Sequence, residues 1–422
     1  MMKILWFSNK AFSDKDDCSS GTWLGALAKN LVATGQVELF NITIGNVEVP
    51  IKQDAGAIHQ WIIPISKSRR DGLPPSHIIA ELVGIVKDVS PDLVHIWGTE
   101  SYWGLLSARN LIQQPVLLET QGLKFAIAKV FHGGLTFSEQ ISSIGLKELL
   151  RRSTIYQARK SFEEWGIFEK EMLSRHRFIT VQTDWLEAQV RQYNDTCEIF
   201  RNDFVLREEF YSSEKWRHSA NPTIFCTAAY SAPFKGLHVA VRAVSILKKR
   251  LPAIRLRIAG AHQRKGFRQD GYISWVNQEI SRLGIDNHVT WLGPLSAPQI
   301  IAELLECAAV VIPSFVEGYC LGLAEALMIG TPAVAAFSGG IPCIAKNDES
   351  ALFFPPGDEA MCAYQLRKVL SDRKLAESLS QEGIKIAERR NDWSKVVKKQ
   401  LEIYRQVLSE ILLGTSHKLS SH

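Results

Sequence analysis

The sequence predicts an α/β protein built from two parallel-sheet domains. Short apolar runs alternate with amphipathic stretches of helical length along the whole chain, which is typical of parallel sheets covered on both faces. The 422 residues, 46% hydrophobic and 22% charged, are enough for two or three domains with real cores. A polar stretch at 212–221 separates the runs into two sets, so we expect two open sheets.

The apolar runs have strand length and end at turn residues. In the first half we expect strands at 4–7, 37–42, 93–96, 116–120 and 178–181. In the second half we expect them at 223–228, 255–258, 289–292, 309–312 and 333–335.

The domain boundaries follow from the linker and from the last helix. Asn221 and Pro222 end the polar stretch, and Thr223 opens the second set of strands. A final helix over about 395–413 carries apolar residues at helical spacing, namely Val397, Leu401, Tyr404, Leu408 and Ile411. We therefore expect an N-terminal domain at 1–215, a second domain at 216–394 and a C-terminal helical segment at 395–422.

Two carboxylates stand eight residues apart, at Glu317 and Glu325, around a glycine-bearing turn. On one helix they would lie about 12 Å apart along the axis and roughly 80° apart around it, so they could not hold the same small group. Pro313 and Gly318 break the chain, and 321–329 has the composition of a helix stopped by Gly330. Glu317 is therefore expected in a loop and Glu325 inside the helix. The unpaired amides of the first turn lie between them and suit an anion flanked by hydroxyl-rich groups.

This segment resembles the E-x7-E signature of retaining glycosyltransferases of family 4, which have the GT-B fold. The likeness covers 314–335, then Ser338-Gly-Gly-Ile-Pro and Phe354-Pro-Pro-Gly-Asp, and upstream 234–237 and 258–260. The resemblance implies two Rossmann-like domains that face each other across a cleft, with the last helix packing back on the first domain. In such sheets ligands bind at the carboxyl ends of the strands.

The resemblance also assigns roles in a nucleotide-sugar site. Lys235 matches the lysine that binds the donor diphosphate, Glu317 the residue that meets the transferred sugar, and Glu325 the residue that binds the ribose hydroxyls. We expect Glu317 and Lys235 to be catalytic. The amides of 318–321 are expected to face sugar and phosphate, so the donor-binding set also includes Gly318, Tyr319, Cys320, Leu321 and Gly260.

One departure concerns the donor phosphates. The family usually carries Gly-Arg five to six residues before the lysine, whereas this chain has Ala229 and Tyr230. A tyrosine hydroxyl can donate a hydrogen bond to phosphate but carries no charge. The missing cation would have to come from elsewhere, and Arg264, Lys265 and Arg268 are candidates.

In the first domain, Gly21 and Thr22 occupy the place of the family's glycine-rich loop after strand one, with Thr22 where a second glycine is usual. Gln121 stands where a histidine is often found. Polar or glycine-bearing loops also occur around Glu100 and His132. We expect Gln121, His132 and Glu100 on the acceptor side, although simple turns would give the same short patterns.

Other ligand classes lack their motifs. The chain has neither a G-x-G-x-x-G after a strand nor a P-loop, and Asp14-Lys-Asp16 fits a polar loop or helix cap better than a metal-binding D-x-D. Seven cysteines without a C-x-x-C pair predict reduced thiols, and the histidine spacings offer no zinc site. We expect no metal and no cofactor besides a nucleotide sugar as substrate.

The net charge is +5, and Lys147, Arg151, Arg152, Arg159 and Lys160 cluster before several aromatic residues. A basic helix with aromatics can rest on anionic lipid, although a solvated helix with its apolar face on the core gives the same pattern. No signal sequence is visible, because the first apolar run is too short. We therefore expect a cytoplasmic chain, with peripheral contact to the inner face of the membrane as an option and no nucleic-acid partner.

Taken together, the sequence predicts a metal-independent hexosyltransferase that moves a sugar, with retention, from a UDP or GDP sugar to a hydroxyl of a glycan or lipid-linked acceptor in polysaccharide or lipopolysaccharide assembly. Two alternatives stay open. One is a non-catalytic partner subunit of this fold, which would explain Tyr230, and the other is a sugar-nucleotide epimerase or phosphorylase.

Overall fold

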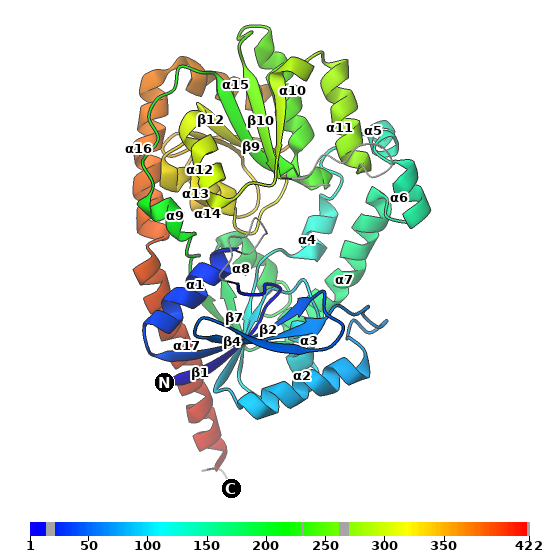
Figure 1. Cartoon of the computed structure of the whole chain (residues 1–422), viewed down its shortest axis with the longest axis vertical. Helices are drawn as coiled ribbons and strands as arrows, with labels where there is room; N and C mark the ends of the chain where they lie inside the picture. Colours follow the sequence, from blue (N-terminus) through cyan, green and yellow to red (C-terminus); the bar gives the residue numbers. More distant parts are fainter. Residues whose placement is uncertain (14–21, 230–231, 261–269, 420–422) are drawn as a thin grey trace. The chain divides into compact units, whose positions relative to one another are not determined.

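The computed structural model describes residues 1–13, 22–229, 232–260 and 270–419 (Figure 1). It divides into two compact units. Unit 1 comprises Met1–Phe125, Glu164–Leu206 and Asn391–His422, and unit 2 comprises Ala126–Glu163 and Arg207–Arg390. Each unit is built on its own sheet, so the predicted pair of α/β domains is confirmed.

Unit 1 contains an eight-stranded sheet in the order β3-β4-β2-β1-β5-β6-β7-β8. Its strands run in parallel except β3, which pairs antiparallel with β4 at the edge. The central strands β1 and β5 are the most apolar, and residues 4–7 and 93–97 are fully or almost fully buried. The bounds are β1 Met2–Phe7, β2 Val37–Gly45, β3 Ile51–Ala55, β4 Ile58–Pro64, β5 Leu93–Trp97, β6 Val116–Glu119, β7 Phe178–Val181 and β8 Glu198–Arg201.

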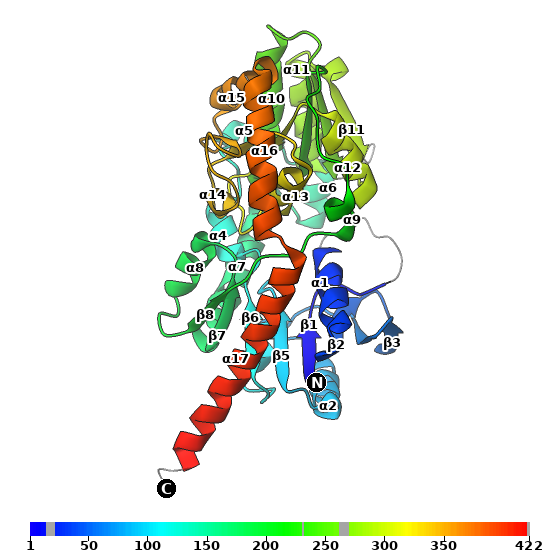
Figure 2. The same ribbon diagram turned by 90° about the vertical axis from the view of Figure 1, so that its left-hand side faces the viewer.

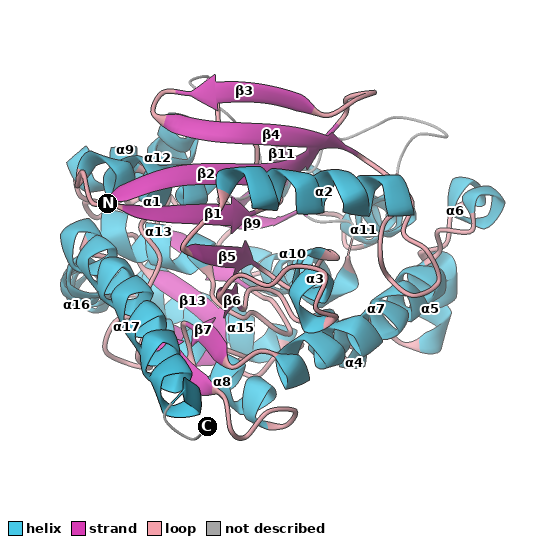
Figure 3. Ribbon diagram, turned by 90° about the horizontal axis from the view of Figure 1, so that it is seen from below, coloured by secondary structure: helices cyan, strands magenta, loops and turns pink. Residues whose placement is uncertain are grey.

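Helices cover this sheet, and Figure 3 shows α2 along one side of the strands. The last helix, α17, packs on α1 and is tied to the sheet through Tyr404, whose hydroxyl accepts from Trp6 Nε1 at 3.0 Å and lies 2.9 Å from His95 Nδ1. The helices are α1 Thr22–Ala33, α2 Ser76–Val89, α3 Trp103–Ala108, α7 Ile155–Arg175, α8 Asp184–Arg191 and α17 Trp393–Leu419, and the boundary between the units falls within α7.

The core of unit 1 holds a carboxyl group, that of Glu119 at the end of β6. It is 2% exposed, accepts a hydrogen bond from Gln182 Nε2, and lies 3.5 Å from His95 Nε2. Burial raises the pKa of Glu119 to about 8, although hydrogen bonds from Thr180 and Gln182 oppose the shift. The native state therefore keeps a proton here that the unfolded chain has lost at neutral pH.

We expect Glu119→Gln to remove one component of the pH dependence of stability. Between the unfolded pKa and about 8 the native wild type binds the extra proton, so the contribution of this group to the free energy of unfolding falls as pH rises, by up to ~1.4 kcal/mol per pH unit. Urea titrations at pH 5 and pH 8 measure the free energy of unfolding of both proteins. The value for Glu119→Gln, relative to that of the wild type, should be higher at pH 8 than at pH 5. Parallel profiles for the two proteins would contradict the assignment.

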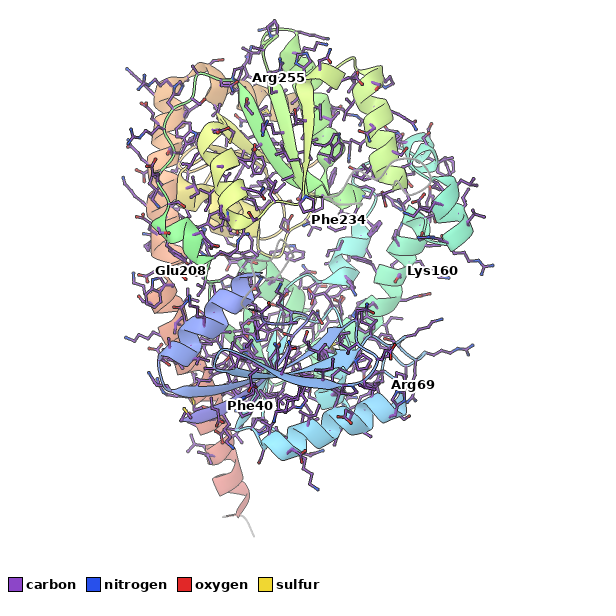
Figure 4. All side chains as sticks on the ribbon, in the orientation of Figure 1. Phe40, Arg69, Lys160, Glu208, Phe234 and Arg255 are labelled. Atoms are coloured by element: carbon purple, nitrogen blue, oxygen red, sulfur yellow. The ribbon has the colours of Figure 1, made fainter. Side chains whose placement is uncertain are left out.

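Unit 2 contains a six-stranded sheet, entirely parallel, in the order β11-β10-β9-β12-β13-β14. Arg255 at the start of β10 and Phe234 after the end of β9 mark its opposite ends in Figure 4. The strands are β9 Thr223–Ala229, β10 Arg255–Gly260, β11 Val289–Gly293, β12 Ala309–Ile312, β13 Ala333–Ala336 and β14 Leu352–Phe354.

The helices of unit 2 pack on both faces of this sheet, and α16 runs along the outside of α13 and α15 (Figure 2). Helices α10 and α13 are largely buried, with eight of twelve and six of nine residues in the core. The helices are α9 Glu208–Ser212, α10 Leu237–Lys248, α11 Gly271–Arg282, α12 Ala297–Glu306, α13 Leu321–Ile329, α14 Ile341–Ile344, α15 Glu359–Ser371 and α16 Arg373–Arg390.

Residues 126–163 group with unit 2, whereas the sequence placed them in the N-terminal domain. They carry most of α4 Lys124–Lys129, α5 Phe137–Ser142 and α6 Leu146–Arg151. A Cβ on Gly133 would stand 2.3 Å from the carbonyl oxygen of Pro233, and the carbonyl of Gly133 lies 2.9 Å from His238 Nε2. Such close backbone approach is a tertiary contact that no local pattern reveals.

Candidate functional site

The candidate site of unit 2 lies where β9 and β12 end. Strand β12 finishes at Ile312, and α13 runs from Leu321 to Ile329 and is capped by Gly330, whose φ of 88° suits a glycine. The predicted order of strand, loop and helix is therefore confirmed, with Glu317 in the loop and Glu325 in the second turn of the helix. Both carboxylates lie at the carboxyl end of a parallel sheet, where ligands of such sheets bind.

Two loops meet at this edge and bring Lys235 to Glu317. The amide of Phe315 donates to the carbonyl of Phe234 at 2.7 Å, so the loop after β12 is held against the loop after β9. Lys235 Nζ lies 2.8 Å from Glu317 Oε1, and the two side chains are 23% and 14% exposed. The ammonium group of Lys235 and the carboxylate of Glu317 thus form a partly buried ion pair at this edge of the sheet.

The approach of the two loops requires a glycine next to the lysine. Gly236 has a φ of 73°, and a Cβ there would stand 2.0 Å from the carbonyl oxygen of Pro313. We expect Gly236→Ala to lower the free energy of unfolding by several kcal/mol, since it adds a steric clash to the ~1–2 kcal/mol cost of the left-handed conformation.

Gly284→Ala is the matched control for that substitution. Gly284 has a similar φ of 63°, but no atom lies within 4 Å of its added Cβ. Chemical denaturation should give a clearly larger loss for Gly236→Ala than for Gly284→Ala. Equal losses would mean that backbone strain alone, and not the contact with Pro313, makes the glycine necessary.

A second glycine supports the backbone of Glu317. The amide of Gly340 donates to the carbonyl of Glu317 at 2.7 Å, and a Cβ on Gly339 would stand 2.1 Å from the same oxygen. Ser338 Oγ donates to the carbonyl of Ser314 at 2.7 Å. The Ser338-Gly-Gly segment therefore fixes the course of the loop that carries Glu317.

Glu325 is paired with an arginine that the sequence did not single out. Arg207 donates from Nε and Nη2 to Glu325 Oε1 at 3.1 and 2.7 Å, and each side chain is 13% exposed. Burial raises the pKa of Glu325, and the guanidinium of Arg207 opposes that shift. Within the described part of the chain Oε2 accepts no hydrogen bond from a side chain or backbone group, so it remains available to a ligand.

The first turn of α13 lies between the two ion pairs. Its N-cap, Cys320, is 5% exposed and makes no side-chain capping hydrogen bond. Burial raises the pKa of the Cys320 thiol, so the group stays neutral. Tyr319, one residue earlier, lies with its ring 6.0 Å from the guanidinium carbon of Arg390. Gly318, Tyr319, Cys320 and Leu321 thus form the turn between the loop carboxylate and the helix.

Residues 210–386 match the model of the family described as glycosyl transferases group 1. The match includes Lys235, Glu317 and Glu325. The chain carries a group 1 glycosyltransferase domain.

Curated relatives match part of the chain. A D-inositol 3-phosphate glycosyltransferase of Saccharomonospora viridis is 28% identical over 194 residues, which are 45% of this chain and 44% of that protein. The chain is thus aligned with less than half the length of that relative.

Solved structures match nearly the whole chain. A sucrose-phosphate synthase from Thermosynechococcus elongatus covers 97% of this chain and 100% of its own, with a TM-score of 0.71 at 16% identity. The HepE protein of Anabaena in complex with UDP-glucose covers 100% of both chains, with a TM-score of 0.64 at 16% identity. At such identities the likeness concerns the fold, which is the GT-B fold.

Outside the glycosyltransferase domain, Glu100 and Gln121 lie together in unit 1. Glu100 Oε1 accepts from the amide of Gly122 at 2.8 Å, and Lys124 Nζ donates to the carbonyl of Glu100 at 2.7 Å. Gly98 leaves room for both side chains, because a Cβ there would stand 2.1 Å from Glu100 Oε2 and 3.5 Å from the amide carbon of Gln121. Burial raises the pKa of Glu100.

His132 belongs to unit 2 and is not part of that cluster. Its ring lies 5.1 Å from the ring of Tyr156, and Nε2 has no hydrogen-bond partner among the described residues. Burial and the nearby charge of Arg159 lower the pKa of His132, so the ring is neutral at pH 7. The three residues expected on the acceptor side are therefore divided between the two units.

The remaining predicted site residues belong to the glycine-rich loop and to the phosphate contacts. Gly260 is the last residue of β10, at the same edge of the unit 2 sheet as Lys235, and has a φ of 127°. Thr22 begins α1, and its side chain is not described. Gly21, Tyr230 and the alternative cations lie outside the described residues, as does the D-x-D sequence.

Two further findings apply to the described residues only. None of their helices is both long and apolar enough to cross a membrane. Nor do they bring three or more His, Cys, Asp or Glu side chains together in a group that could hold a metal ion.

Proposed function

We propose that the chain is a retaining hexosyltransferase that uses a nucleoside diphosphate sugar as donor and a hydroxyl of a glycan or lipid-linked molecule as acceptor. The observation that carries the proposal is the Lys235–Glu317 pair, 2.8 Å apart at the carboxyl ends of β9 and β12, within the glycosyltransferase domain.

Departure of the nucleoside diphosphate is the step that needs this pair. Negative charge grows on the leaving phosphate as the bond to the sugar breaks, and a preorganised cation stabilises that charge more in a water-poor site than in bulk solvent. Lys235 supplies the cation, and Glu317 holds it in place until the phosphates enter. The first-turn amides of α13 add partial positive charge on the same side.

Glu325 serves the nucleoside end of the donor. Its carboxylate is held by Arg207 through Oε1, which leaves Oε2 to accept from ribose hydroxyls. The guanidinium of Arg207 lowers the pKa of Glu325 against the effect of burial, so it favours the ionised form of the carboxyl group. The complexes of the fold neighbour HepE with UDP and UDP-glucose support UDP as the first nucleotide to test.

The acceptor side is proposed to include Glu100 and Gln121 of unit 1 and His132 of unit 2. A carboxyl, an amide and a neutral imidazole are groups that pair with sugar hydroxyls. An acceptor used in polysaccharide or lipopolysaccharide assembly would place the chain in the cytoplasm, at a membrane surface. The six described cysteines, none of which forms a disulfide, support a reducing compartment.

A thermal-shift screen tests the proposal. UDP, GDP and ADP and their sugars are added to the wild type and to Glu325→Ala, because a ligand that binds only the native state raises the melting temperature. We expect one nucleotide class to stabilise the wild type and to lose its effect in the variant. If no nucleotide shifts the wild type, the chain is not a transferase of this kind.

The nucleotide sugar that raises the melting temperature is then incubated with the protein, with and without glycan acceptors, in the presence of EDTA. Metal-independent transfer predicts unchanged turnover with the chelator. Donor binding without hydrolysis or transfer would favour the partner-subunit alternative, and conversion of the donor without an acceptor hydroxyl would favour an epimerase or phosphorylase.

A further inference from the structure

Helices α5 and α6 present apolar side chains to solvent. Phe137 is 73% exposed and Leu150 76%, and three more large apolar side chains on these two helices are about half exposed or more, namely Ile141, Leu146 and Leu149. Their spacing places them on one face of each helix, i and i+4 on α5 and i, i+3 and i+4 on α6. We call these five residues the apolar face of α5 and α6.

The opposite sides of the two helices hold carboxylates against the rest of unit 2. Glu139 of α5 pairs with Arg242 of α10, and Glu148 of α6, which is buried, accepts from the amide of Gly271 at 3.2 Å. A Cβ on Gly271 would stand 2.4 Å from the carbonyl oxygen of Ser143. The usual arrangement of a surface helix, apolar side inward and charged side outward, is therefore reversed here.

The charges that remain on the outside are positive. Arg151 and Arg152 at the end of α6 are exposed, and so is Lys160 on α7, which Figure 4 labels. Lys147 is half-buried and lies 3.9 Å from the buried Glu148. Glu139 is paired with Arg242 and Glu148 is buried, so the acidic groups of α5 and α6 face the rest of unit 2 and the exposed surface is apolar and cationic.

We propose that the apolar face of α5 and α6, with Arg151 and Arg152, docks unit 2 on an anionic lipid bilayer. Apolar side chains enter the boundary between head groups and acyl chains, and the basic groups meet lipid phosphates. Glu139 and Glu148 contact Arg242 and the amide of Gly271, so their negative charge is kept away from the lipid surface and the two helices are attached to the rest of unit 2.

Charge decides between a bilayer and another protein surface. A second copy would bring the same cationic residues face to face, and like charges across an interface repel. The apolar side chains are distributed over two short helices and not gathered in a groove, which suits insertion into a soft interface better than capture of one peptide. A bilayer with anionic head groups satisfies both observations.

Vesicle co-sedimentation of the full chain tests the proposal without any donor or turnover, so its outcome is separate from that of the proposed activity. Vesicles of phosphatidylcholine alone are compared with vesicles that contain phosphatidylglycerol, at low and high salt. We expect binding to the anionic vesicles only, with a strong decrease at high salt, because screening weakens the attraction of basic residues to the surface.

Two variants separate the apolar and electrostatic parts. Leu146→Ser/Leu149→Ser/Leu150→Ser is expected to lower the partition coefficient by about tenfold or more, since three side chains no longer enter the interface. Arg151→Gln/Arg152→Gln is expected to lower it by about tenfold or more and to reduce the salt dependence. Circular dichroism shows whether each variant is folded.

Ile65→Ser is the matched control, since Ile65 is 68% exposed and is also followed by basic residues at 67, 69 and 70. It should bind as the wild type does. The proposal is overturned if the wild type stays in the supernatant with anionic vesicles or if the leucine variant and the control bind equally. It is also overturned if ultracentrifugation shows a wild-type dimer that the leucine variant loses.

Discussion

Replacing Lys235 with methionine is expected to lower kcat by about 100- to 1000-fold, with a much smaller change in KM for the donor. The lysine acts on charge that develops as the nucleoside diphosphate leaves, so its removal weakens binding of the transition state more than binding of the substrate. Steady-state kinetics with the donor identified by thermal shift give both parameters.

Two further substitutions make that result specific. Lys235→Arg keeps a cation next to Glu317 and should retain more activity than the methionine variant, though less than the wild type, because the guanidinium is larger and planar. Lys346→Met removes a 62% exposed lysine 3.5 Å from Glu349 and should leave kcat unchanged. Equal kcat values for Lys235→Met and Lys346→Met would contradict the catalytic role.

The order of strand, loop and helix at this site could be predicted because its signals are local. Pro313, Gly318 and Gly330 break the chain at fixed points, and the predicted helix at 321–329 coincides with α13. All ten predicted strands exist; nine of them lie inside a sheet, and the tenth, β11, is an edge strand whose residues are half-buried or exposed. The predicted fold class depended only on the alternation of these runs.

Four strands were missed, of which β3, β8 and β14 lie at sheet edges and β4 lies between β2 and β3. Every residue of β3 is exposed or half-buried, and it pairs antiparallel with β4 at the edge of the sheet. Half of β8 is partly exposed, and β14 has only three residues. Edge strands need little apolar surface, and their hydrogen bonds come from a neighbour distant in sequence.

The partners of the site residues could not be predicted either. Arg207 pairs with Glu325 across 118 positions of sequence, and its local sequence, Arg207-Glu208-Glu209, looks like a solvated charge cluster. Residues 126–163 follow a strand of unit 1 yet belong to unit 2, because Gly133 fits against Pro233. Both facts depend on tertiary contacts, which leave no periodic trace in the sequence.

Arg207→Met should be the most destabilising of the charge substitutions. It leaves the carboxylate of Glu325 largely buried with no partner, and breaking such a pair costs about 3–5 kcal/mol. Without the guanidinium the pKa of Glu325 rises further above its unfolded value. The native state then binds a proton that the unfolded state does not, so the loss of stability is largest at high pH and shrinks as the pH falls through the raised pKa.

The double variant Arg207→Met/Glu325→Gln separates stability from donor binding. It buries no unpaired charge, so it should recover most of the free energy of unfolding, whereas donor affinity should stay at least tenfold below that of the wild type because the ribose loses an ionic acceptor. Arg257→Met is the control, since Arg257 is 34% exposed and pairs with Glu303 elsewhere in unit 2. Denaturation at pH 6 and pH 9 and calorimetric titration with the donor measure both effects. If Arg207→Met keeps the stability and the donor affinity of the wild type, the guanidinium has no role in holding Glu325, and the ribose site must lie elsewhere.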